Sequence, residues 1–159
     1  MKKIIFSSLL CLLILSCKSS SSAAGTNLDK KAEVAIKGTW EIASVSYPGS
    51  DVISVNSFDI ADSKCFIGSN WKFVSNNNTG TMAIQKRDCP SFSSPITWYI
   101  NKEGNFVMKV LNAGEKAKRV REGYVLRVAN QTDGSFQLVD RITVGGSSAD
   151  VVYQFIRVN

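Results

Sequence analysis

The chain has 159 residues, a length that allows one folded domain once a leader and a linker are removed. Its formal charge of +6 is mild and its Lys and Arg residues are scattered, so the composition does not indicate a nucleic-acid-binding protein. Histidine is absent, which removes the commonest general base and metal ligand and excludes a Ser-His-Asp triad. No P-loop or zinc motif is present, and we therefore expect no catalytic residue, no metal site and no cofactor.

Residues 1–16 have the pattern of a secretory leader. A positive start at Lys2 and Lys3 precedes an apolar run that ends at Leu15 and is too short to span a bilayer comfortably as a helix. Ser16 and Cys17 follow this run, and a small residue directly before a Cys resembles the lipobox of bacterial lipoproteins. In that family the Cys becomes the new N-terminus and carries acyl chains. This resemblance implies lipidation of Cys17, where several acyl chains would make a stable membrane anchor. The alternative is a conventional cleaved signal in which Cys17 has no role.

Residues 17–36 are interpreted as the lipidated Cys and a Ser-rich tether. The stretch from Lys18 to Lys31 has almost nothing to bury and would span about 20 Å as a flexible chain. A short helical turn over Ala32–Ile36 is expected to lead into the first strand. We expect a lipid-anchored protein of the cell envelope, and Lys18, in place of the Asp that marks inner-membrane retention in enterobacteria, favours the outer membrane.

From residue 37 onward, short β-rich runs alternate with Gly, Asn and Asp turns, and no long amphipathic helix is apparent. Each run has apolar side chains on one face and polar side chains on the other. The pattern predicts an all-β domain over residues 37–159, an eight-stranded antiparallel up-and-down barrel, with a sandwich as the alternative. The expected strands are Gly38–Tyr47, Asn70–Val74, Thr81–Lys86, Ile96–Ile100, Phe106–Leu111, Gly123–Ala129, Phe136–Ile142 and Asp150–Val158.

Seven large side chains fall on the predicted inward faces and are candidate ligand-binding residues. A barrel of this size can enclose a cavity for a small hydrophobic molecule, or it can be filled by its own side chains. The sequence leaves both possibilities open. The seven residues are Trp71, Phe73, Met82, Trp98, Phe106, Met108 and Tyr124.

Two cysteines, Cys65 and Cys89, remain once Cys11 leaves with the leader and Cys17 is lipidated. In a chain that has crossed into an oxidising compartment, a disulfide between them is the default. The bridge would join the open ends of a hairpin over 70–86 and would contribute roughly 3 kcal/mol by loop-closure entropy. The alternative, a thiol nucleophile, would need a base other than His.

Two charged features invite a functional interpretation, and for both we favour a solvated surface. Asp59 lies in a weakly patterned stretch over 52–61 that contains at most one short strand, and Asp62 directly follows this stretch. The two offer too few oxygen ligands for Ca²⁺. The densest basic cluster, between Lys116 and Arg121, is typical of an exposed loop. A contact with an anionic lipid or polyanion is the alternative for this cluster.

The folded part resembles the lipocalin-like lipoproteins common in the Bacteroidetes. Gly38-Thr39-Trp40 stands where lipocalins carry Gly-X-Trp on the first strand. That group carries a Cys…Trp-X-Phe…Asn-X-X-Gly…Cys run, and the turn here departs slightly from its usual form. The matching residues are Cys65, Trp71-Lys72-Phe73, Asn78-Thr79-Gly80 and Cys89.

The resemblance also implies roles for residues of the first and last strands. In lipocalins a basic residue late in the chain often packs over the first-strand Trp, which here implies a cation–π contact between Arg157 and Trp40, with Arg141 as the competitor. Gly38, Trp40 and Arg157 would then form a structural signature at the closed end of the barrel. The middle lipocalin motif, Thr-Asp-Tyr, is represented only by Thr132-Asp133.

The expected function is non-catalytic: a monomeric, membrane-anchored lipocalin-like protein that binds or carries a small hydrophobic molecule at the cell envelope. The first alternative is a protein-interaction lipoprotein with a filled barrel, either a hydrolase inhibitor or an accessory subunit of an envelope complex. A second alternative is an enzyme that uses carboxylates or Tyr, which would require a cleft with a buried carboxylate.

Overall fold

The computed structural model describes residues 31–50, 54–112, 116 and 123–158. The predicted signal peptide, Cys17 and most of the predicted tether lie outside these residues. A short helix at residues 31–36 precedes the first strand, and no described helix is long and apolar enough to cross a membrane. The remaining elements are β1 (Gly38–Ser46), β2 (Asn56–Ser57), β3 (Ala61–Asp62), the 3₁₀ helix η1 (Ser63–Phe66), β4 (Asn70–Val74), β5 (Thr79–Ile84), β6 (Phe92–Ile100), β7 (Asn105–Val110), β8 (Tyr124–Ala129), β9 (Ser135–Val144) and β10 (Ser147–Arg157).

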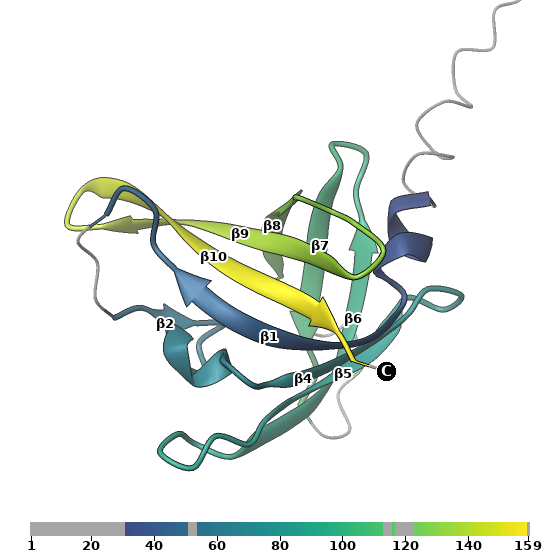
Figure 1. Ribbon diagram of the computed structural model, residues 1–159, viewed down its shortest axis with the longest axis horizontal. Helices are drawn as coiled ribbons and strands as arrows, with labels where there is room; N and C mark the ends of the chain where they lie inside the picture. Colours follow the sequence, from purple (N-terminus) through teal and green to yellow (C-terminus); the bar gives the residue numbers. More distant parts are fainter. Residues whose placement is uncertain (1–30, 51–53, 113–115, 117–122, 159) are drawn as a thin grey trace, which may run out of the picture.

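The strands form a closed antiparallel barrel in the order β1-β10-β9-β8-β7-β6-β5-β4, and β4 pairs with β1 to complete it (Figure 1). Consecutive strands from β4 to β10 pair with one another, and β1 closes the ring by pairing with both β10 and β4, which confirms the predicted up-and-down barrel. The weakly patterned stretch after β1 forms a separate two-stranded sheet of β2 and β3. Closure leaves none of the eight barrel strands with an unpaired edge.

The barrel has two distinct ends, which we call the base and the mouth. At the base, β1 begins, β10 ends, and the helix of residues 31–36 lies beside them (Figure 1). Glu33 of this helix accepts hydrogen bonds from the backbone N–H of Ile100, at the end of β6, and from Asn78, both at 3.1 Å. At the mouth, β7 ends, β8 begins, and the β2–β3 hairpin folds against the barrel.

The interior is a continuous core of apolar side chains. Inward positions alternate with outward ones, so that Ile96, Trp98 and Ile100 of β6 are buried while their neighbours face outward. Aromatic rings contact one another along the barrel axis. The rings of Phe136 and Phe155, which are directly opposed on β9 and β10, stack with centroids 4.6 Å apart.

The predicted disulfide between Cys65 and Cys89 is confirmed, with Cα atoms 5.6 Å apart. Cys65 lies in η1, immediately before β4, and Cys89 follows the end of β5. The bridge therefore ties together the two open ends of the β4–β5 hairpin. It also attaches η1 to the mouth side of the barrel, because β5 runs from the base toward the mouth.

Candidate ligand-binding site at the mouth of the barrel

The base of the barrel is closed by side chains around Trp40. The indole Nε1 of this fully buried residue donates to the carbonyl of Ile36 at 2.7 Å. The guanidinium of Arg157 lies over the ring, 4.3 Å from its centroid, and its Nε donates to the carbonyl of Asp133 at 2.8 Å. The cation–π contact expected between Arg157 and Trp40 is therefore present, whereas Arg141 is exposed on β9.

Most of the candidate ligand-binding residues lie in the packed core. The indole N–H of Trp71 donates to Ser69 at 2.8 Å and that of Trp98 to the carbonyl of Thr79 at 2.9 Å, so neither polar group requires a ligand. Contact between these core residues and a ligand stays a prediction. The six that are at most 1% exposed are Trp71, Phe73, Met82, Trp98, Phe106 and Met108.

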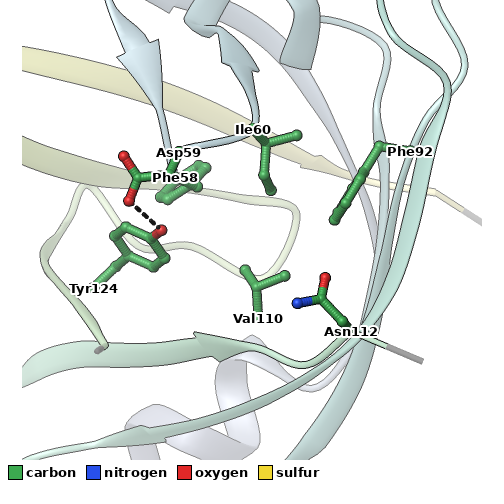
Figure 2. Close-up of a pocket in the computed structure, with 7 residues that line it drawn as sticks. All are labelled: Phe58, Asp59, Ile60, Phe92, Val110, Asn112 and Tyr124. Atoms are coloured by element: carbon green, nitrogen blue, oxygen red, sulfur yellow. Dashed lines mark hydrogen bonds between the residues drawn. The ribbon is translucent and has the colours of Figure 1, made fainter. Parts of the chain in front are cut away.

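The seventh candidate, Tyr124, lines a pocket at the mouth with a volume of about 390 Å³. The β2–β3 hairpin, the start of β6, the end of β7 and the start of β8 each contribute to its wall (Figure 2). The pocket is open to solvent, and four of its seven described lining residues are Phe, Ile or Val. Its lining residues are Phe58, Asp59, Ile60, Phe92, Val110, Asn112 and Tyr124.

Phe58 separates this pocket from the core. Its side chain is only 6% exposed, and its ring packs edge-to-face against Tyr124, with centroids 5.1 Å apart. On the other side the ring contacts Phe66, Trp71 and Tyr153, at centroid distances of 5.2, 6.2 and 5.4 Å. Phe58 therefore forms the floor of the pocket and the upper limit of the aromatic core.

The hairpin that carries Phe58 is held in an unusual backbone conformation. Phe58 and Asp59 both have positive φ angles, 55° and 53°, as the two central residues of a type I′ turn require. This conformation is unfavourable for a bulky side chain such as Phe58. A hydrogen bond of 2.6 Å between the hydroxyls of Ser57 and Tyr153 anchors the hairpin to β10. The burial of Phe58 and this anchor together stabilise the turn.

The polar groups of the pocket lie at opposite sides of it. On one side the Tyr124 hydroxyl donates to the carboxylate of Asp59 at 3.0 Å, and on the other side is the amide of Asn112 (Figure 2). No Lys or Arg lines the described wall. Within the described part of the chain, Asp59 takes part in no ion pair. Among its described lining residues, the pocket thus combines apolar side chains with polar groups and one carboxylate at its rim.

The other acidic groups near the mouth have different environments. The hydroxyl of Ser54 and the backbone N–H of Lys64 donate to Asp62, which holds the pKa of this carboxyl below its ordinary value and caps η1. Asp140 is paired with buried Val151 across β9 and β10, so it faces inward, and burial raises its pKa. Among the described residues, no three His, Cys, Asp or Glu side chains gather in a way that could hold a metal ion.

Sequence reasoning missed most of the pocket. Tyr124 was found because it lies on a strand with clear alternation, but Asp59 was interpreted only as solvated. The other lining residues lie in turns, at strand ends or in the weakly patterned stretch, where no period of two marks the inward side. They are Phe58, Ile60, Phe92, Val110 and Asn112.

The sequence matches the model of the lipocalin-like domain family over residues 36–138. This match covers more than half of the chain, and the protein belongs to the lipocalin-like domain family. It extends from the end of the short helix into β9, and the remainder of β9 and β10 complete the same barrel. No curated protein matches the sequence.

Solved structures to which this chain is similar include three of bovine odorant-binding protein. The complexes with a selenium-containing odorant and with its natural ligand each have 11% sequence identity and a TM-score of 0.44. They cover 80% and 79% of this chain, and 73% and 72% of their own. The protein from bovine nasal mucosa has 11% identity and a TM-score of 0.43, and covers 81% of this chain and 74% of its own. Similarity at this level is too distant to transfer a ligand.

Proposed function

We propose that this protein is a non-catalytic lipocalin-like protein that binds a small hydrophobic molecule in the mouth pocket. The observation that carries the proposal is the pocket itself, which has Phe58 as its floor and Ile60, Phe92 and Val110 in its wall. Small-molecule sites are typically concave and mostly apolar, with a few polar groups that fix orientation. The volume of about 390 Å³ lies at the lower end of the range for such sites, which favours a small ligand.

The geometry favours entry from one direction only. Trp40 and Arg157 occupy the base, and the aromatic core fills the barrel between the base and Phe58. A ligand would therefore reach the pocket through the mouth and would contact the β2–β3 hairpin first. Burial of its apolar surface against Phe58, Ile60 and Phe92 would supply about 25 cal/mol for each Å² removed from water.

We also propose that the protein acts at the cell envelope as a lipid-anchored monomer, with the outer membrane as its location. The leader of residues 1–16 and the lipobox-like Cys17 support this proposal. A lipid anchor and a tether before the barrel would hold the protein at the membrane surface, with the mouth pocket at the end of the barrel opposite the tether.

Native mass spectrometry tests the binding function. The chain from residue 17 onward, with Cys17→Ser so that no acyl chain of its own competes for the pocket, is purified without denaturation. We expect a co-purifying small apolar adduct, or saturable binding of N-phenyl-1-naphthylamine. Val110→Trp, which fills the pocket, should abolish binding, whereas Val125→Trp on the outer wall should leave it unchanged. Binding that survives Val110→Trp would place the ligand elsewhere.

A second candidate function, a protein-interaction module, is favoured by a different surface. Tyr99, Val107 and Val125 are directly opposed on β6, β7 and β8, and the two outer residues are exposed while Val107 between them is buried. Tyr99 and Val125 are 48% and 56% exposed, although barrels normally direct large apolar side chains inward. This function would be favoured if native mass spectrometry showed no adduct and the probe did not bind. In addition, the protein should capture an envelope protein, and Tyr99→Ser should abolish that capture.

A further inference from the structure

Asp59 is the one charged side chain among the described residues that line the mouth pocket. We propose, on the basis of the binding function above, that the pocket selects an amphiphile with a short apolar body and a positively charged ammonium head. The apolar body would lie against Phe58, Ile60 and Phe92, and the head would lie at Asp59. Fatty-acid anions of the same length would be rejected.

The carboxylate of Asp59 has unused capacity to accept hydrogen bonds. A carboxylate has about four lone-pair sites, and the Tyr124 hydroxyl occupies one of them at 3.0 Å. Among the described residues no Lys or Arg forms an ion pair with Asp59. An ammonium group, which has only donors, matches these remaining sites.

Aromatic rings lie beside this carboxylate. Figure 2 shows Phe58 and Tyr124 next to Asp59, and the two rings pack edge-to-face with centroids 5.1 Å apart. The face of an aromatic ring attracts a cation within about 6 Å of its centroid, and it offers nothing comparable to an anion. Tyr124 has two roles in this arrangement: its ring lies beside the proposed site of the cation, and its hydroxyl orients the carboxylate of Asp59. The carboxylate and the two rings therefore favour the same sign of ligand charge.

The pocket dimensions and the rim position set the expected size of the effect. A volume of about 390 Å³ suits a chain of roughly eight carbons better than a long-chain lipid. Asp59 is exposed to solvent, so screening limits the contribution of its charge. We expect about a three- to tenfold preference for an amine over the matching neutral alcohol, and a similar factor against the carboxylate.

Three ligands with the same chain separate charge from apolar burial: octylamine, octanol and octanoate. Each is titrated at pH 7 against N-phenyl-1-naphthylamine bound to the chain from residue 17 with Cys17→Ser. The expected order of affinity is octylamine, then octanol, then octanoate. In Asp59→Asn, octylamine should weaken to the level of octanol, while octanol itself stays within about twofold of its original affinity.

Glu103→Gln is the matched control, because it removes the same charge from an exposed turn at the base. This substitution should leave the order of the three ligand affinities and the ratios between them unchanged. Octanoate binding as tightly as octylamine, or an amine preference that persists in Asp59→Asn, would overturn the charge selection while octanol binding still supports the binding function. If neither the probe nor any of the three ligands binds, both the charge selection and the binding function are wrong.

Discussion

At the scale of single residues, Gly38 is the position whose identity the structure explains most directly. Its φ of 134° lies in a region that side-chain-bearing residues rarely adopt. A Cβ atom there would also lie 2.6 Å from Nη1 of Arg157, the residue that covers Trp40. Two separate factors therefore favour glycine at this position of the Gly-X-Trp signature: the positive φ angle, and the space that the Arg157 side chain occupies.

Gly38→Ala should lower the free energy of unfolding by about 1–3 kcal/mol, mainly because of backbone strain. Displacement of Arg157 from Trp40 should add about 0.5–1 kcal/mol, the value of an exposed cation–π contact. Urea denaturation of Gly38→Ala, Arg157→Ala and the double variant separates the two effects. Most of the cost should persist in the Arg157→Ala background. A cost that disappears there would mean that φ is not its cause.

Asp140 is an inward-facing carboxyl whose environment disfavours its charge. Because burial raises its pKa in the folded state, the folded protein binds more protons than the unfolded chain between the two pKa values. Stability from this group is fully present below the unfolded pKa of about 3.9 and is lost as pH rises through the folded pKa.

Asp140→Asn should therefore unfold at a higher temperature than the unchanged protein at pH 7, because an uncharged amide replaces a half-buried carboxylate. The difference should shrink as pH falls and Asp140 becomes protonated in the folded protein. Thermal unfolding of both proteins from pH 4 to pH 8 measures this. Asp150→Asn is the control, because this residue lies on the outer wall and forms an ion pair with Arg127. Its unfolding temperature relative to the unchanged protein should not show the same rise between pH 4 and pH 8. Equal stability of Asp140→Asn and the unchanged protein at pH 7 would contradict the burial argument.

At the scale of elements, the β2–β3 hairpin limits the depth of the mouth pocket. Its Phe58 ring occupies the space between Tyr124 and the buried Trp71 and Tyr153. Removal of this ring would extend the pocket toward the core. The hairpin thus determines both the volume of the site and the length of ligand that fits.

Phe58→Ala should cost about 3 kcal/mol of stability, because a buried ring and its aromatic contacts are lost. It should also allow longer ligands. Binding is measured for alcohols from octanol to dodecanol. Affinity for the unchanged protein should stop increasing with chain length within this series, whereas the binding free energy of Phe58→Ala should improve by up to about 0.8 kcal/mol for each added methylene. Tyr99→Ala on the outer wall is the control. The same dependence on chain length in both proteins would mean that Phe58 is not the floor of the ligand site.

The elements that could be predicted from the sequence are those with a period of two. Strands such as β4 and β5 could be predicted because their buried positions alternate over five or six residues. The start of β6 was missed because Pro95 interrupts the pattern, and the observed strand begins at Phe92. Pro95 is tolerated because Ser94 donates its hydroxyl to the carbonyl of Leu111, to which a backbone N–H at residue 95 would otherwise donate.

The mouth could not be predicted in the same way. The strands β2 and β3 have two residues each, too few to show alternation, and their hairpin is defined by the tertiary contacts of Phe58 and Ser57. The base was more predictable, because the Gly-X-Trp signature implied the Arg157 contact. Family resemblance therefore located the closed end, and only the structure located the open one.

At the scale of the whole molecule, location depends on a segment outside the described residues. If Cys17 carries the anchor, Cys17→Ala should release the protein from the membrane fraction into the soluble fraction, because no acyl chain is attached. Fractionation followed by immunoblotting measures this, and Cys11→Ala, within the leader, is the control. Retention of Cys17→Ala in membranes would contradict lipid anchoring at this residue.

The closed barrel also has a direction. The helix of residues 31–36 and the end of β10 lie together at the base, where Arg157 donates to the carbonyls of Ala35 and Lys37, whereas the pocket opens at the other end. A sensor chip, fluorescent label or fusion partner attached before residue 31 or after residue 158 would therefore leave the entrance unobstructed. Immobilisation through either end should preserve access, whereas attachment through the β2–β3 hairpin should block it.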